Sequence, residues 1–126
     1  MGYRSDLVVV IYPDTQTKEE DIAPYDAMKT FMATTFKEVA DTFHDDLTWH
    51  DDYHCLKFKI DDAKWYESYP DVQVFEDMMR FFRDETRGYC TEYARVGESN
   101  DDIEEIYTGH NMRYMTHIKR AIECDI

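Results

Sequence analysis

Glycine and proline are scarce in this sequence of 126 residues, which has four glycines and three prolines. The glycines, Gly2, Gly88, Gly97 and Gly109, stand far apart, so no glycine-rich loop is available to cradle a phosphate group. Long hydrophobic runs are also missing, because the apolar stretch from Leu7 to Tyr12 is too short for a membrane span or a cleaved signal peptide. These absences exclude a nucleotide-binding loop and lead us to expect a cytoplasmic protein.

Cysteine is the next scarce residue. Cys55, Cys90 and Cys124 are odd in number and show no Cys-x-x-Cys spacing, which is typical of buried thiols in a reducing compartment and not of a structural disulfide. Cys90 lies between Tyr89 and Thr91 in an alternating segment, so we predict that its thiol is buried and does not act as a nucleophile.

Basic residues are also few. The chain has 14 lysines and arginines against 28 aspartates and glutamates, a formal net charge of -14. A surface this negative repels nucleic acid and attracts a basic protein, such as an enzyme that holds nucleic acid. Disordered acidic proteins are poor in aromatic residues, whereas this chain is 15% aromatic and 43% hydrophobic. We therefore expect a single folded domain over residues 1–126 that buries a core.

The first half of the chain alternates between strand and helix patterns. The β-branched run from Leu7 to Tyr12 predicts a central strand buried on both faces. Apolar residues at helical spacing predict one helix, and they are Tyr25, Met28, Met32, Phe36, Val39 and Phe43. Residues 47–50 and 53–60 predict a hairpin with Asp51 and Asp52 as a two-residue turn. Its second strand would turn Leu56, Phe58 and Ile60 to the core and Cys55, Lys57 and Lys59 to solvent.

The second half predicts a helix from about Asp71 that Gly88 ends. Its arginines, Arg80, Arg83 and Arg87, are expected to pair with neighbouring acids, Glu76, Asp77 and Asp84, and the alternative is a basic patch that the inhibitory face avoids. Strands follow over residues 89–96 and from 112 to about 122, separated by an acidic loop over 97–109 with a helical turn at 101–107. The expected fold class is α+β, with a ferredoxin-like βαββαβ core and an added C-terminal strand. Helices would cover one face of a mainly antiparallel sheet.

Acidic residues near aromatic ones are the candidate partner-binding site. Carboxylates spaced like phosphates can occupy a groove built for nucleic acid, and aromatic side chains add the anchors that charge lacks. The expected residues are Asp45, Asp46, Trp49, Asp51, Asp52, Tyr53, Asp61, Asp62, Glu98, Asp101, Asp102, Glu104 and Glu105. Trp65 is instead expected to pack over the core. The alternative for the acids is a solvated surface that only keeps the protein in solution.

Histidines and aspartates cluster at residues 44–46 and 50–54. Imidazole and carboxylate groups can ligate a metal or form a base with its orienting acid. The spacing matches no standard metal motif, so we expect no metal, no cofactor and no catalytic residue. A small metal-dependent or acid–base enzyme centred on His44, His50 and His54 is the alternative function. A homodimer formed through an exposed sheet edge is a third possibility.

Three segments carry a resemblance to a family of small bacteriophage proteins to which no activity is assigned. They are residues 2–6, residues 64–72, and the acidic stretch 95–104. The resemblance implies a phage accessory protein that acts in the host cytoplasm. By analogy with acidic phage proteins that imitate DNA, it implies binding and inhibition of a host nucleic-acid-handling or defence enzyme. Such a protein is not an enzyme and binds neither nucleic acid nor a membrane directly.

Overall fold

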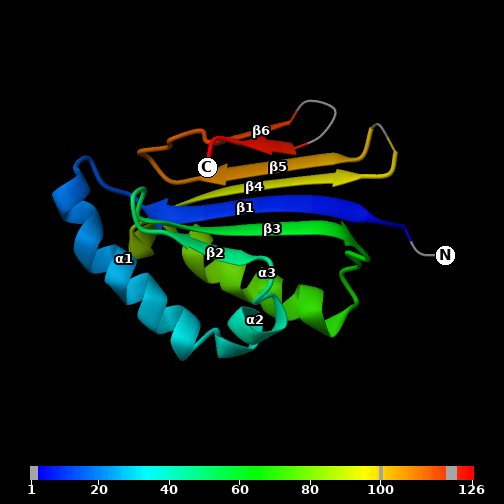
Figure 1. Cartoon of the computed structure of the whole chain (residues 1–126), viewed down its shortest axis with the longest axis horizontal. Helices are drawn as coiled ribbons and strands as arrows, with labels where there is room; N and C mark the ends of the chain where they lie inside the picture. The colour runs from blue at the N-terminus through cyan, green and yellow to red at the C-terminus, as the bar shows by residue number, and fades with distance from the viewer. Residues whose placement is uncertain (1–2, 100, 119–121) are drawn as a thin grey trace.

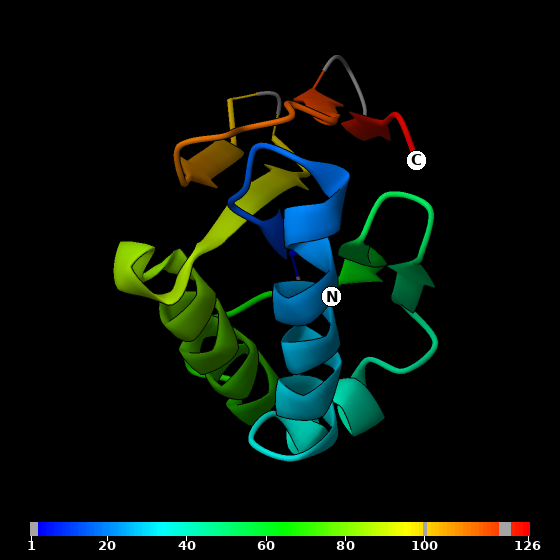
Figure 2. The ribbon, with the colours of Figure 1, turned by 90° about the vertical axis from the view of Figure 1, so that its left-hand side faces the viewer.

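The computed structural model describes residues 3–99, 101–118 and 122–126, which form an α+β fold (Figure 1). A five-stranded antiparallel sheet has the strand order β2-β3-β1-β4-β5, and β6 pairs with β7 in a separate two-stranded sheet. Figure 2 shows the helices on one side of the larger sheet and the β6–β7 hairpin on the other. Within the described residues, no helix is long and apolar enough to cross a membrane.

The central strand β1, Ser5–Pro13, is buried on both faces, as its β-branched sequence predicts. It pairs with β3, Cys55–Ala63, on one side and with β4, Tyr89–Gly97, on the other. Leu7, Val9 and Ile11 face the helices, and Val8, Val10 and Tyr12 face the C-terminal hairpin. Both faces of the sheet therefore carry a hydrophobic cluster.

The predicted first helix is in fact two helices, α1 at Lys18–Ala33 and α2 at Lys37–Thr42. Thr34 leaves the helical conformation with φ -121° and ψ -81°, and the backbone N–H of Phe36 donates to the carbonyl of Phe31 at 2.8 Å. The Phe36 ring then packs 5.1 Å from the Phe81 ring of the third helix. A β-branched threonine pair with poor helix propensity and this aromatic contact favour the break.

The hairpin of β2, Leu47–His50, with β3 is confirmed, but its turn is longer than predicted. His50 pairs with Cys55, so residues 51–54 form a four-residue loop in which His54 has a positive φ of 52°. The expected solvent face of β3 is also only partly exposed. Lys59 is exposed, whereas Cys55 is fully buried in the second cluster with Met115 of the C-terminal region.

The helix predicted from about Asp71 is confirmed as α3, Pro70–Arg83. It is followed by the short helix η1, Glu85–Arg87, and by Gly88, whose φ is 82°. The predicted ion pairs of its arginines are also confirmed. They are Arg80 with Asp77 at 2.9 Å, Arg83 with Glu76 at 3.5 Å and Arg87 with Asp84 at 3.9 Å.

The acidic stretch after β4 is a strand, β5 at Ile103–Thr108, so the predicted loop with a helical turn is wrong. Pairing with β4 places Ile106 opposite Tyr93 and Glu104 opposite Arg95, so the charge of one of the two adjacent glutamates is compensated across the strands. The single strand predicted from residue 112 is instead a loop and the hairpin of β6, Thr116–Ile118, with β7, Ile122–Cys124. Residues 119–121 of that prediction lie outside the described residues.

The expected ferredoxin-like core with one added strand is not confirmed. The larger sheet has a fifth strand, β5, beyond β4, and this strand is formed by residues for which the sequence predicts a loop. The C-terminal residues form a second layer on the face away from the helices instead of joining the sheet.

A buried carboxylate connects that second layer to the sheet. Glu92 is fully buried on β4 and accepts hydrogen bonds from the Tyr12 hydroxyl at 2.6 Å and from the Thr116 N–H at 2.9 Å. The Tyr12 hydroxyl in turn accepts from the N–H of Arg113 at 2.7 Å. Burial is the main reason that the pKa of Tyr12 is raised well above its ordinary value.

Replacement of Tyr12 by Phe tests this network. The change leaves a carboxylate oxygen of Glu92 and the N–H of Arg113 without their partner, so we expect the free energy of unfolding to fall by about 1–3 kcal/mol. Urea denaturation measures it. The control is Tyr114→Phe, at a side chain 61% exposed, which should change stability by less than about 0.5 kcal/mol. Equal effects of the two substitutions would contradict the role of the network.

Candidate functional site

Strand pairing brings several acidic loops to the end of the sheet where β1 begins. Ser5 pairs with Ala63 of β3 on one side and with Gly97 of β4 on the other, so the segments around these residues flank the start of β1. The N–H of Lys59 donates to the Asp46 carbonyl at 2.9 Å, which places the segment before β2 beside the middle of β3, two residues before Asp61. Loops far apart in the sequence therefore meet at one edge of the fold.

We call this group of carboxylates the acidic end, and its members are Asp45, Asp46, Asp61, Asp62, Glu98, Asp101 and Asp102. Five of the seven residues are exposed, and Asp46 and Asp102 are half-buried. The pKa of Asp46 is raised, first by burial and then by repulsion from Asp45 and Asp61, which shows that these three negative charges lie close together.

The first residues of the described chain hold the loops of the acidic end in place. The Tyr3 hydroxyl donates to Asp102 at 2.6 Å, and the Tyr3 N–H donates to the Tyr66 hydroxyl at 2.6 Å. The Arg4 N–H donates to Glu98 at 2.8 Å, and its guanidinium donates to the carbonyl of Asp62 at 3.1 Å. This segment thus bridges the loop after β3 and the loop after β4.

Arg95 fixes the carboxylate of Asp102. Its guanidinium nitrogens donate to the two oxygens of Asp102 at 3.1 and 2.8 Å, and its Nε donates to Glu104 at 3.4 Å. Hydrogen bonds from Arg95 and Tyr3 lower the pKa of Asp102 to about 2. Gly97 permits this close approach, because a Cβ atom there would overlap the Asp102 carboxylate and the Tyr3 hydroxyl.

Glu104 is joined to the acidic end through Arg95, and the other predicted partner-binding residues lie elsewhere. Asp51, Asp52 and Tyr53 are in the β2–β3 turn, at the opposite end of the sheet. Asp51 accepts from the Tyr25 hydroxyl at 2.6 Å and from Lys29 at 3.0 Å, and these hydrogen bonds lower its pKa.

Trp49 and Glu105 also have contacts away from the acidic end. Trp49 packs on the ring of Tyr25 with a centroid distance of 5.8 Å. Glu104 is paired to Arg95, whereas Glu105 accepts from the Tyr107 hydroxyl at 3.0 Å. The predicted site residues therefore do not form one surface.

A cleft of about 560 Å³, called here the α3 cleft, adjoins the acidic end between α3 and the strands β4 and β5. Its charged lining residues are Glu67, Glu76, Asp77, Asp102, Glu104, Arg80 and Arg95, and its aromatic ones are Tyr3, Trp65, Tyr66 and Tyr93. Trp65 packs against the core as predicted, 5.2 Å from the Phe75 ring. Sequence reasoning missed the cleft because no periodicity joins its segments.

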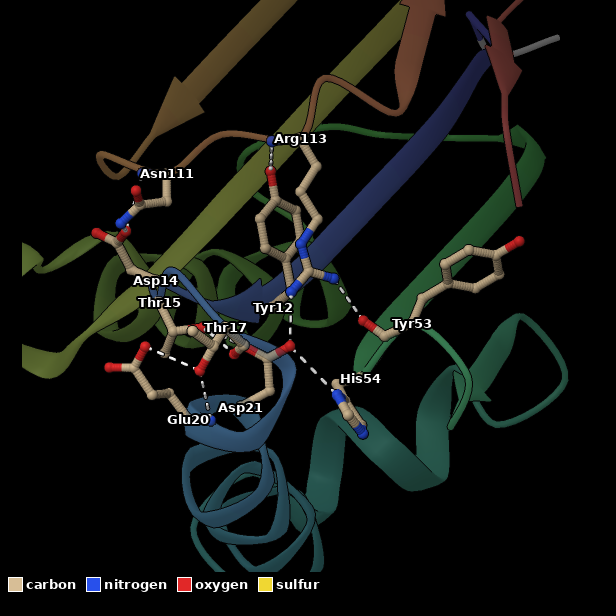
Figure 3. Close-up of polar contacts among 10 residues, drawn as sticks. All are labelled: Tyr12, Asp14, Thr15, Thr17, Glu20, Asp21, Tyr53, His54, Asn111 and Arg113. Atoms are coloured by element: carbon tan, nitrogen blue, oxygen red, sulfur yellow. Dashed lines mark hydrogen bonds and ion pairs between the residues drawn. The ribbon is translucent and has the colours of Figure 1, made fainter.

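A second polar cluster lies at the other end of β1 (Figure 3). The carboxylate of Asp21, 3% exposed, contacts Nδ1 of His54 at 3.2 Å and accepts from the Arg113 guanidinium at 3.0 Å and from the Thr15 hydroxyl. A cleft of about 310 Å³ borders the cluster and is also lined by Lys18. The acid beside His54 is thus Asp21 and not one of the aspartates in its own loop.

The three histidines of the alternative enzyme function make different contacts. His44 is exposed and contacts its neighbour Asp45 at 3.3 Å, and the His50 ring lies 6.5 Å from that of Tyr53. In the part of the chain that the structure describes, no group of three or more His, Cys, Asp or Glu side chains is arranged to hold a metal ion.

Two of the cysteines are buried and unreactive. Burial raises the pKa of Cys55 and of Cys90 to about 12, so both thiols stay protonated at neutral pH. The prediction that Cys90 is buried is confirmed, and all three cysteines are free.

Comparison with known proteins gives no match to a family model, a curated protein or a solved structure. The resemblance to small phage proteins therefore stays a prediction.

Neutralising Asp102 tests the internal pairing of the acidic end. Because its folded pKa of about 2 lies below the unfolded value of about 3.9, the pair stabilises the fold above pH 4 and loses this effect as the pH falls towards 2. We expect Asp102→Asn to lower the free energy of unfolding by about 1 kcal/mol at pH 7, with a difference from wild type that narrows below pH 4. Asp101→Asn is the control and should not show this pH dependence. A stability difference between Asp102→Asn and wild type that does not change with pH would contradict the pairing.

Proposed function

We propose that this protein binds a basic surface of a host nucleic-acid-handling or defence enzyme and inhibits it, as a phage-type inhibitor and not as an enzyme. The observation that supports the proposal is the acidic end, where Asp46 feels the charges of Asp45 and Asp61 and where Arg4 bridges Asp62 and Glu98 beside the start of β1. Grooves that hold nucleic acid are lined by Lys and Arg side chains, which favour such a surface.

Repulsion within the acidic end gives the interaction an energetic basis. Burial, followed by the charges of Asp45 and Asp61, raises the pKa of Asp46, so the ionised form of Asp46 is disfavoured in the free protein. A partner that places Lys or Arg side chains among them relieves this repulsion. Exposed charges also steer the encounter and make its rate depend on salt.

Aromatic side chains beside the acidic end supply anchors for the complex. Tyr69 is 41% exposed, and its ring packs 5.1 Å from that of Tyr66 in the connector after β3. Tyrosines that are held rigidly at a surface contribute strongly to interfaces. Trp49 and Tyr53, the anchors expected from the sequence, lie on the other side of the fold, so Tyr66 and Tyr69 replace them in this proposal.

An acid–base enzyme is the second candidate function, favoured by the contact between Asp21 and His54. A buried carboxylate that orients an imidazole beside a cleft is the arrangement of a general base. Asp21 is, however, also neutralised by Arg113, and the Thr15 hydroxyl donates to Asp21 instead of approaching His54 as a nucleophile would.

Neutralising the repelling carboxylates tests the leading proposal. A pull-down from bacterial lysate first identifies the basic partner, which is then purified for affinity measurements. The triple variant Asp45→Asn, Asp46→Asn, Asp61→Asn should weaken binding by about tenfold, because each lost charge removes a modest attraction. Wild-type affinity should decrease as the salt concentration is raised from about 50 to about 300 mM.

The matched control removes three exposed acids at other places, Glu19→Gln, Asp26→Asn and Asp52→Asn, and gives the same change in net charge. It should change the affinity by less than about twofold. Equal weakening by both triple variants would show that only net charge matters, and salt-insensitive binding would exclude an electrostatic interface.

A further inference from the structure

We infer that the α3 cleft is a binding site for a guanidinium or alkylammonium group carried on an aliphatic chain. The inference goes beyond the proposed function, because it concerns a cavity beside the acidic end and holds for a free amine as well as for an Arg or Lys side chain. Its volume of about 560 Å³ falls in the range of sites that enclose small ligands.

The charge of the lining favours a cation. Five acidic residues line the cleft against two arginines. Both arginines are already engaged, Arg80 with Asp77 at 2.9 Å and Arg95 with Asp102 at 2.8 Å and Glu104 at 3.4 Å. An anionic ligand would therefore have to compete with these carboxylates, whereas a cation would meet Glu67 and Glu76, which are not paired to either arginine.

Glu76 is the carboxylate best placed to receive the cation. It lies on α3 with a half-buried side chain, and its nearest cation is Nη1 of Arg83 at 3.5 Å. The other two guanidinium nitrogens of Arg83 are buried and have no hydrogen-bond partner among the described residues, so the pair is a single long contact. Burial raises the pKa of Glu76 in spite of Arg83, which indicates that its negative charge is incompletely compensated.

The aromatic lining suits the rest of such a ligand. Trp65, Tyr66 and Tyr93 present ring surfaces that pack against methylene groups and attract a positive charge by cation–π interaction. A guanidinium is already accommodated by one of these rings, since Arg83 lies 5.1 Å from the centroid of Tyr93. Carboxylate and aromatic ring together distinguish a cation on an apolar chain from a neutral polar ligand.

The test is a titration followed by nuclear magnetic resonance of the tryptophan indole N–H signals, with Trp49→Phe used to assign that of Trp65. The probes are N-acetylarginine amide, butylguanidine, which carries the guanidinium on an alkyl chain without a peptide backbone, and N-acetylcitrulline amide. The citrulline compound has nearly the same shape as the arginine compound without its charge. We expect a saturable shift of the Trp65 signal with a Kd of about 1 mM for the cations and none for citrulline.

Binding of both cations supports a site for the charged group itself, and binding of the arginine amide alone supports a site for a side chain of a polypeptide. No saturable shift with either cation, or an equal shift with citrulline, would overturn the inference. Because the cation pairs with ionised Glu76, its affinity should increase as the pH rises through the raised pKa of Glu76 and then level off.

Substitutions test whether the cation binds in the α3 cleft or at the neighbouring acidic end. Glu76→Gln should weaken arginine amide binding by roughly tenfold, whereas Glu105→Gln should not change it. If Glu76→Gln does not fold, the citrulline comparison in the wild-type protein still decides the question. The triple variant of Asp45, Asp46 and Asp61 should bind arginine amide normally, so loss of the protein partner and loss of the cation site are distinguishable.

Discussion

Burial of β1 on both faces is the constraint on which the rest of the structure depends. Every residue from Leu7 to Tyr12 is at most 3% exposed, with helices on one face and the C-terminal hairpin on the other. Removing this much apolar surface from water is the main driving force available to a chain with so many charges. Neighbouring strands pair along its whole length, so the two ends of β1 become the two polar ends of the protein.

The high negative charge is organised by these ends and is not spread uniformly. At one end, Arg95 and Tyr3 donate to Asp102, whereas the half-buried Asp46 is repelled by Asp45 and Asp61. At the other, Arg113 links the layers, since its N–H donates to Tyr12 and its guanidinium donates to Asp21. Buried acids are thus matched to specific donors, and the uncompensated charge is left where a partner can reach it.

Local patterns were sufficient wherever burial follows from spacing along the chain. The central strand, the hairpin, α3, β4 and the ion pairs of Arg80, Arg83 and Arg87 all follow from alternation or from helical steps. The break before Phe36, the strand β5 and the C-terminal hairpin did not, because each depends on a contact distant in sequence. Ile103–Thr108 is a strand because β4 offers it a free edge and the charge of Arg95.

The sequence by itself determined the α+β class, the two-faced burial of the first strand and a large excess of acidic groups. Only the tertiary structure decided which of those groups are neighbours, because antiparallel pairing on both sides of Ser5 brings Asp62 and Glu98 to the same end and sends Asp51 and Asp52 to the other. The α3 cleft likewise exists only after folding, since its walls come from segments that meet through the packing of α3 against the sheet. Spacing along a chain sets what a segment can bury, and the pairing of segments sets what lies beside it.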